Sequence, residues 1–266
     1  MITSISNLDW TPFLKKQHFV LFITIVLCSC SQQRQELNSI TGSTIKIQED
    51  HEGDSTIDAW VSPYRDRINT VLDSTLAHAP KMMHKNDGKL NSSIGNLMAD
   101  IVMERTATIF ERRQNLKLDF TVLNHGGIRS IISTGPVSAR TAYQIMPFEN
   151  YIVVVDMPGS AVKELLTFLA RSKRAHPISG MSIKLDGNGT LKTVKIQGEP
   201  FEEQKNYRVA TTDYLVQGGD SMGFFSKKDT VYETGYLLRN ALIDHFKVVD
   251  TLKANVDQRF ITEGNE

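Results

Sequence analysis

The segment TVLNHGGIRS, residues 121–130, holds side chains that suit two different kinds of chemistry. Its histidine and asparagine are potential metal ligands, of the kind that hydrolytic metal centres gather from loops at strand ends. Its two glycines let backbone N–H groups approach a ligand closely, and Arg129 offers a planar guanidinium that suits phosphate or carboxylate. The segment is therefore either a metal-binding loop or a turn that presents Asn124 and Arg129 to a ligand.

The distribution of histidines argues against the metal-binding loop. A dinuclear phosphoesterase centre needs several aspartate, histidine and asparagine ligands from separate loops. The chain has seven histidines, but they are scattered, and none forms a His-x-Asp or Asp-x-His pair. We therefore predict no metal ligands in this chain and expect a turn that faces a ligand. A purely structural turn with a surface arginine is the alternative.

Two further segments are candidates for the rest of a ligand site. Phe148 follows Pro147, whose fixed backbone would give the ring a defined direction, although a core position is the alternative. The segment TTDYLVQGGDSMGFF again predicts a strand that ends in paired glycines, and Asp220, Met222 and Phe224 follow them. Two such loops can flank a flat ring, and stacking contributes about 1–3 kcal/mol per base.

Helices that would position these loops are predicted at two places ahead of them. In the first, Ser62 is a candidate N-cap and Pro63 suits the first helical position. Its apolar stripe would comprise Ile68, Val71, Leu72 and Leu76. In the second, NSSIGNLMADIVMERTATIF, Ser92 or Ser93 would cap a helix with an apolar face of Ile94, Leu97, Met98, Ile101 and Val102.

The rest of the chain alternates strand and helix patterns. KLDFTVLN predicts the strand that ends at residues 121–130, and NYIVVVDM and NYRVATTDYLV predict further strands. SARTAYQIM, GSAVKELLTFLARS and GYLLRNALIDHFKVV predict helices, and GMSIKLDGNGTLKTVKI predicts a hairpin. Because hairpins interleave with helices, we predict an α/β fold with mixed sheets rather than a purely parallel one.

Composition excludes one class of partner. The chain has 266 residues, 40% of them hydrophobic, and its 30 lysines and arginines balance 30 aspartates and glutamates. This charge balance lacks the broad basic surface that neutralises nucleic-acid phosphates, so we predict no nucleic-acid partner.

The N-terminal residues resemble an export signal. Lys15, Lys16 and His18 precede an apolar run of nine residues, FVLFITIVL, which is too short to cross a bilayer of about 30 Å. LCSC then resembles a bacterial lipobox, so we predict a signal peptide over residues 1–30, lipidation at Cys30 and a lipid-anchored protein of the bacterial cell envelope. An ordinary cleaved signal peptide or an uncleaved anchor is the alternative. Both cysteines lie here, which leaves no internal disulfide in the mature domain.

Residues 31–56 are polar, low in aromatic residues and without a sustained period, which predicts a flexible tether. The folded domain is predicted over residues 57–262.

Four motifs in this domain carry a resemblance to a known family. SSIGNLMAD, NHGGIRS, MPFENYIVVVDMPGSAVKELL and YRVATTDYLVQGGDSMGFF have the order and rough spacing expected of the 5'-nucleotidase C-terminal domain. The resemblance implies a four-layer α-β-β-α fold that holds a nucleoside, with the catalytic dinuclear metal centre in a separate N-terminal metallophosphoesterase domain. It implies that Asn124 and Gly127 line the base pocket, Arg129 contacts ribose or phosphate and Phe148 forms one face of an aromatic clamp.

The sequence departs from the family pattern at three points. At the second clamp position, usually an aromatic residue after GGDG, it has Met222, with Phe224 two residues further on, and a thioether covers a ring face less specifically. Ahead of IGNL, where relatives carry another ligand arginine, only Lys89 is near. We also expect no metallophosphoesterase domain here, and hence no catalytic residues and no bound cations to generate a hydroxide nucleophile.

Three functions remain open from the sequence. The leading hypothesis is a lipid-anchored subunit that recognises a nucleoside or nucleotide and acts with a separately encoded metallophosphoesterase in nucleotide catabolism. Divalent metals are expected only on that partner. The second is an envelope scaffold or binding module with a decayed pocket and no hydrolase role, and the third is a self-sufficient phosphohydrolase.

Overall fold

The computed structural model describes residues 37–46 and 53–264. The predicted signal peptide, Cys30 and much of the predicted tether lie outside these residues. The chain divides into two units, residues 1–54 and 55–266, and residues 37–46 of the first are exposed and form neither helix nor strand. Within the described residues, no helix is both long enough and apolar enough to span a membrane.

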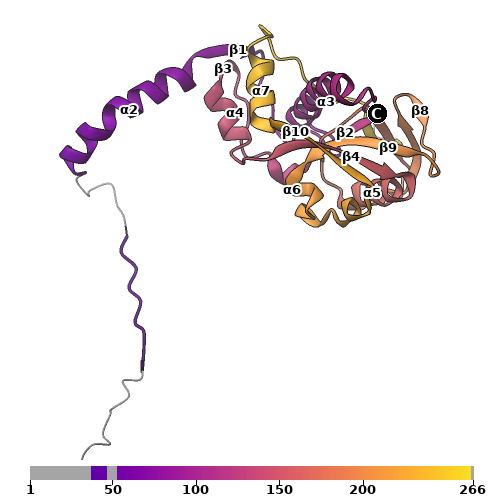
Figure 1. Cartoon of the computed structure of the whole chain (residues 1–266), viewed down its shortest axis with the longest axis horizontal. Helices are drawn as coiled ribbons and strands as arrows, with labels where there is room; N and C mark the ends of the chain where they lie inside the picture. The colour runs from indigo at the N-terminus through magenta and orange to yellow at the C-terminus, as the bar shows by residue number, and fades with distance from the viewer. Residues whose placement is uncertain (1–36, 47–52, 265–266) are drawn as a thin grey trace, which may run out of the picture. The chain divides into compact units, whose positions relative to one another are not determined.

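The second unit alternates helices and strands, as Figure 1 shows. Its helices are α2 (Ser55–Asp73), α3 (Ser93–Gln114), α4 (Ala139–Ile145), α5 (Gly159–Ser172), α6 (Asp213–Val216) and α7 (Leu238–Phe246), with short 3-10 turns η1 (His125–Gly127), η2 (Gly219–Ser221) and η3 (Gly223–Lys227). Its strands are β1 (Thr75–Ala79), β2 (Phe120–Val122), β3 (Gly135–Ser138), β4 (Tyr151–Pro158), β5 (Ile178–Ser179), β6 (Met181–Leu185), β7 (Leu191–Ile196), β8 (Glu199–Pro200), β9 (Asn206–Thr212), β10 (Thr230–Leu237) and β11 (Phe260–Thr262).

The two larger sheets are both mixed. The five-stranded sheet has the order β10-β4-β9-β2-β5, in which β2 pairs with β9 in parallel and the other pairs are antiparallel. The four-stranded sheet has the order β11-β6-β7-β8, with β11 parallel to β6. The predicted α/β class with mixed sheets is confirmed.

Each face of the five-stranded sheet packs against its own hydrophobic cluster. Because side chains alternate along a strand, Ile152 and Val154 of β4 join the cluster that contains α3 and α7. Val153 and Val155 join the cluster that contains α5 and the four-stranded sheet. Figure 1 shows α3 and α7 on one side of this sheet and α5 on the other. The central strands are therefore covered on both faces, which fixes the loops at their ends.

Helix α3 matches the sequence prediction closely. The Ser92 side chain accepts a hydrogen bond from the Gly95 backbone N–H, and Asn115 ends the helix in the left-handed region with φ 55°. Ser92 is thus the N-cap, which satisfies a backbone donor that the helix leaves free. The apolar stripe predicted for this helix is buried in the cluster beneath it.

Helix α2 differs from the prediction in its start and in its apolar face. It begins at Ser55, so Pro63 lies inside it and the Ser62 hydroxyl donates to Asp66 instead of capping a helix. No residue of α2 is buried, and Ile68 and Val71 are exposed. Leu76 lies beyond the helix, in β1, and packs against the first cluster. Of the predicted stripe, Leu76 therefore packs against the core, whereas Ile68 and Val71 do not.

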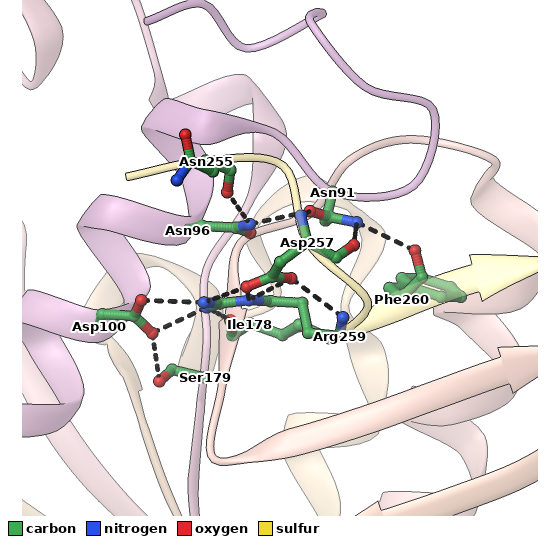
Figure 2. A network of polar contacts seen from close by, with 9 residues as sticks. All are labelled: Asn91, Asn96, Asp100, Ile178, Ser179, Asn255, Asp257, Arg259 and Phe260. Carbon is green, nitrogen blue, oxygen red and sulfur yellow. Dashed lines mark hydrogen bonds and ion pairs between the residues drawn. The ribbon is translucent and has the colours of Figure 1, made fainter. Parts of the chain in front are cut away.

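A polar network fixes the C-terminal segment to α3 and β5 (Figure 2). The Arg259 guanidinium donates to Asp100 of α3, to Asp257 and to the Ile178 carbonyl, and Asp100 also accepts from Ser179. Although burial alone would lower the pKa of Arg259, hydrogen bonds to the two carboxylates outweigh it and raise that pKa.

Asparagines extend this network to β11. The Asn91 side chain donates to the Asp257 and Phe260 carbonyls, and Asn96 donates to Asn91 and to the Asn255 carbonyl. Since β5 pairs with β2, the network also supports the strand that leads into residues 121–130.

Candidate functional site

A cavity of about 250 Å³ opens where three loops meet. Its lining comprises Asn124, Gly126, Gly127, Arg129, Phe148, Asn150, Tyr214 and Asp220. The first four follow β2, Phe148 and Asn150 lie between α4 and β4, and the last two belong to α6 and η2. The structure thus brings the predicted residues Asn124, Gly127, Arg129 and Phe148 together at one site.

Asp220 connects two of these loops through hydrogen bonds. It accepts from the Asn124 side chain at 2.6 Å and from the Tyr214 hydroxyl at 3.1 Å. Asn124 is only 6% exposed, so its orientation is fixed by this contact. Asp220 has φ 51°, in the left-handed region that Asp and Asn tolerate better than most residues. The carboxylate is therefore held at the cavity with acceptor capacity left for a ligand.

Two glycines in these loops are required by close packing. A Cβ atom on Gly127 would lie 2.8 Å from the Asn124 side-chain oxygen, and one on Gly219 would overlap the Tyr214 ring. One glycine of each pair therefore lets its loop approach a cavity residue, Gly127 beside Asn124 and Gly219 beside Tyr214.

Two aromatic rings line the cavity and remain accessible. Phe148 is 42% exposed and Tyr214 is 43% exposed, so neither ring is packed into the core. The Arg129 guanidinium lies 5.9 Å from the centre of the Phe148 ring, within the range of a cation–π contact. The cavity therefore offers flat apolar surface beside a cation and a carboxylate.

Arg239 of α7 holds the loop that carries Phe148. It is 6% exposed, donates to the Pro147 and Phe148 carbonyls and lies 4.2 Å from the centre of the Tyr143 ring. No local pattern in the sequence points to this role, because the partners of Arg239 are backbone atoms about ninety residues away along the chain.

Two of the predicted ligand residues do not reach the cavity. Met222 is fully buried, and Phe224 is 7% exposed and packs against Phe168 and Phe225. Both belong to the second hydrophobic cluster. Met222 and Phe224, which were predicted for the second ring face, therefore do not line this cavity, whereas Tyr214 does.

The missed aromatic residue had a detectable signal. TTDYLV was assigned wholly to a strand, whereas β9 ends at Thr212 and the next four residues form α6. Asp213 in this segment is a good residue for a first helical turn, and its side chain accepts from the Tyr151 and Tyr214 backbone N–H groups.

His125 is a turn residue, held by contacts on both sides. Its backbone N–H donates to Nδ1 of His176, its Nε2 lies 3.0 Å from the Asn86 side-chain oxygen, and Lys85 donates to the Ile128 carbonyl. Burial lowers the pKa of His125, and the Lys85 charge lowers it further. Burial also lowers the pKa of His176, to about 4. Across residues 37–46 and 53–264, no group of three or more His, Cys, Asp or Glu side chains is placed to hold a metal ion.

A second, basic cavity of about 460 Å³ adjoins the first at Gly126. Its lining includes His125 and the four cationic residues Lys85, Lys89, Lys173 and Arg174. Side chains with these charges favour an anionic group. The two cavities together would suit a ligand that is flat and apolar at one end and anionic at the other.

Comparison with known proteins places this site in a family. The family model described as "5'-nucleotidase, C-terminal domain" matches residues 71–227, more than half of the chain. Protein UshA of Escherichia coli is 28% identical over 183 residues, which are 66% of this chain and 32% of that protein. Cell wall protein Lmo0130 of Listeria monocytogenes is 25% identical over 198 residues, which are 66% of this chain and 25% of that protein.

A solved structure shows the same fold. A 5'-nucleotidase precursor from Thermus thermophilus aligns with a TM-score of 0.66 and 20% identity, over 79% of this chain and 44% of that one. The chain therefore spans less than half the length of each of these three proteins.

Proposed function

The chain belongs to the 5'-nucleotidase C-terminal domain family, and from that membership we propose that its cavity binds the nucleoside part of a nucleotide. The observation that carries the proposal is the pair of accessible rings, Phe148 and Tyr214, at one cavity with Asp220. A base stacked on these rings would gain about 1–3 kcal/mol. The Asp220 carboxylate would accept hydrogen bonds from ribose hydroxyls.

The phosphate end of the ligand would meet the cations. Arg129 lines the first cavity, and the basic cavity begins at Gly126. A guanidinium and several ammonium groups are the side chains that most often bind phosphate. This arrangement favours a nucleotide over an uncharged nucleoside.

We further propose that hydrolysis of the phosphate ester takes place at a metallophosphoesterase on a separate chain. Support comes from the names of relatives such as the Thermus 5'-nucleotidase precursor. In this arrangement the present chain would bind and orient the nucleotide, while divalent metals on the partner would supply the nucleophile.

The proposed location is the bacterial cell envelope, with a lipid at Cys30. It is supported by the lipobox-like LCSC and by the similarity to a cell wall protein. Metabolic labelling with an alkynyl fatty acid would test it, because label should enter the chain and be absent from Cys30→Ser.

The binding proposal is tested by titration calorimetry with adenosine, AMP and UDP-glucose. We expect binding of at least one probe, and we expect Phe148→Ala and Tyr214→Ala each to weaken it about tenfold or more, at the stacking energies above. Tyr151→Ala is the matched control, because Tyr151 is 45% exposed but does not line the cavity.

The outcomes separate the three hypotheses. No binding by any probe, with or without a metallophosphoesterase, would contradict recognition, and an unchanged fold would then favour a scaffold. Metal-dependent phosphate release from AMP by the purified chain alone would contradict the need for a partner.

A further inference from the structure

Helix α2 carries a row of exposed apolar side chains along one face. The exposed fractions are Ile57 61%, Trp60 72%, Tyr64 63%, Ile68 55% and Val71 63%. Trp60 and Tyr64 also contact each other, with ring centres 6.1 Å apart. Single exposed apolar residues are ordinary, but a continuous row of this kind marks an interaction surface.

The spacing of this row is that of a coiled coil. Ile57, Val61, Tyr64, Ile68 and Val71 follow each other at alternating steps of four and three residues. That alternation is the a/d pattern of a heptad repeat, with β-branched Val61 and Ile68 at one of the two positions. We call these five residues the α2 seam.

The rest of the unit holds α2 by a different face. Arg140 of α4 donates to Asn69 at 2.7 Å and forms an ion pair with Asp73. At about 100° per residue, Asn69 and Asp73 lie more than a quarter turn around the helix from the seam. The contact with α4 therefore leaves Tyr64, Ile68 and Val71 exposed.

We propose that a second copy of this chain covers Ile57, Val61, Tyr64 and Ile68 of the α2 seam, with the two helices antiparallel about a two-fold axis. In this register Ile57 packs against Ile68 of the second copy, and Val61 packs against its Tyr64. Each contact occurs twice because the interface is the same patch on both chains.

The charges beside the seam select this register. They place Asp58 next to Arg65 of the second copy and Trp60 next to its Arg67, which gives two ion pairs and two cation–π contacts. Within one helix Asp58 and Arg65 already form an ion pair at 2.8 Å. In the dimer each of these side chains would also lie beside its counterpart on the other chain.

Other registers lose these contacts. A shift by one heptad would set Arg65 against Arg65 and Arg67 against Arg67, and like charges across a seam repel. A parallel pair would leave Asp58 without a cation on the other helix. Since α2 has 19 residues and the seam only five positions, we expect a dissociation constant of about micromolar rather than nanomolar order.

The first test measures the mass of the full chain by sedimentation equilibrium over a range of concentrations. We expect a monomer–dimer equilibrium that Ile68→Glu weakens at least about tenfold, because it places a charge in the apolar seam. Ala59→Glu is the matched control, since it adds the same charge to the opposite face of α2 and should leave the dissociation constant unchanged. A wild-type monomer at all concentrations, or equal effects of the two variants, would overturn the proposal.

The second test isolates the register. Asp58→Arg and Arg65→Asp each remove the ion pair between positions 58 and 65 of their own helix. The homodimer of either variant is therefore not stabilised by this pair. Mixed together, they restore both intermolecular pairs, and we expect the mixture to form heterodimers in preference to either homodimer. Statistical mixing would overturn the antiparallel register.

Since α2 has no buried side chain, far-UV circular dichroism should show all four variants folded.

Discussion

At the scale of single residues, Asp220 is the side chain on which the site depends. It joins the loop after β2 to α6 through Asn124 and Tyr214, and it keeps acceptor capacity at the cavity. In the sequence Asp220 is only the residue that follows paired glycines. Its role follows from one hydrogen bond with Asn124, 96 residues away, and one with Tyr214, six residues away.

Asp220→Asn should weaken AMP binding about tenfold to a hundredfold while leaving the melting temperature nearly unchanged. The amide keeps the size of the carboxylate and tolerates the left-handed backbone, but it loses a charge-assisted acceptor, worth about 1.5–3 kcal/mol. Calorimetry measures the affinity. Glu263→Gln is the control, because this carboxylate is 44% exposed, pairs with Lys192 and lies outside the cavity lining. Equal losses in both variants would contradict a specific role of Asp220.

A second residue-scale prediction concerns His176, whose pKa is lowered by burial to about 4. A lowered folded pKa means that the neutral imidazole stabilises the fold fully above the unfolded value of about 6.5 and that this stability is lost as pH falls toward 4. The shift corresponds to about 3 kcal/mol. Denaturant unfolding between pH 7 and 4, at about unit steps, should show this loss in the wild type and a shallower one in His176→Asn. Identical pH dependence in both would refute the assignment.

At the scale of elements, the loop between α4 and β4 presents Phe148 because α7 holds it. Arg239 donates to two carbonyls of this loop, so the direction of the ring is set by a helix from the far end of the chain. Proline at 147 restricts the backbone, as the sequence predicted, but the restriction alone does not choose between solvent, core and cavity.

Arg239→Lys should therefore reduce AMP affinity several-fold, because an ammonium keeps the charge but cannot reproduce the guanidinium fork. A double-mutant cycle with Phe148→Ala provides the decisive measurement. If Arg239 acts by positioning Phe148, the lysine variant should lose little further affinity once the ring is absent. Additive losses would show that Arg239 acts by another route.

At the scale of the whole molecule, the Arg259 network joins the two ends of the folded unit. It connects α3, β5 and the segment before β11, and through β5 it supports the strand before the cavity. Its energetic role can be distinguished from that of an exposed ion pair, because the Arg259 side chain is only 17% exposed.

Arg259→Met should lower the free energy of unfolding by about 1–3 kcal/mol, because it removes hydrogen bonds from two carboxylates and a carbonyl. Lys192→Met is the comparison, since its ion pair with Glu263 is about half exposed on both sides and should contribute about 0–1 kcal/mol. Denaturant unfolding measures both. A loss for Arg259 no greater than that for Lys192 would contradict a stabilising network.

The sequence determined the local features of this protein. Ser92 caps α3 because its hydroxyl reaches an N–H three residues away, and the alternation in β4 sorts its side chains between two clusters. The ordered motifs identified the family, and the four residues Asn124, Gly127, Arg129 and Phe148 were placed at one cavity. The cap and the alternation depend on spacing within short segments, which the sequence states directly, whereas the four cavity residues were implied by the family resemblance.

Only the tertiary structure decided which apolar and aromatic residues are buried. Met222 and Tyr214 lie eight residues apart, and one fills the core while the other lines the cavity, because β9 ends at Thr212 and turns the following chain. The seam of α2 has heptad spacing of the kind that also occurs in buried helices, yet no residue of α2 is buried and Tyr64, Ile68 and Val71 are exposed. Periodicity shows that a face is apolar, but what covers that face depends on segments distant in the chain, and their positions are set by the packing of the whole fold.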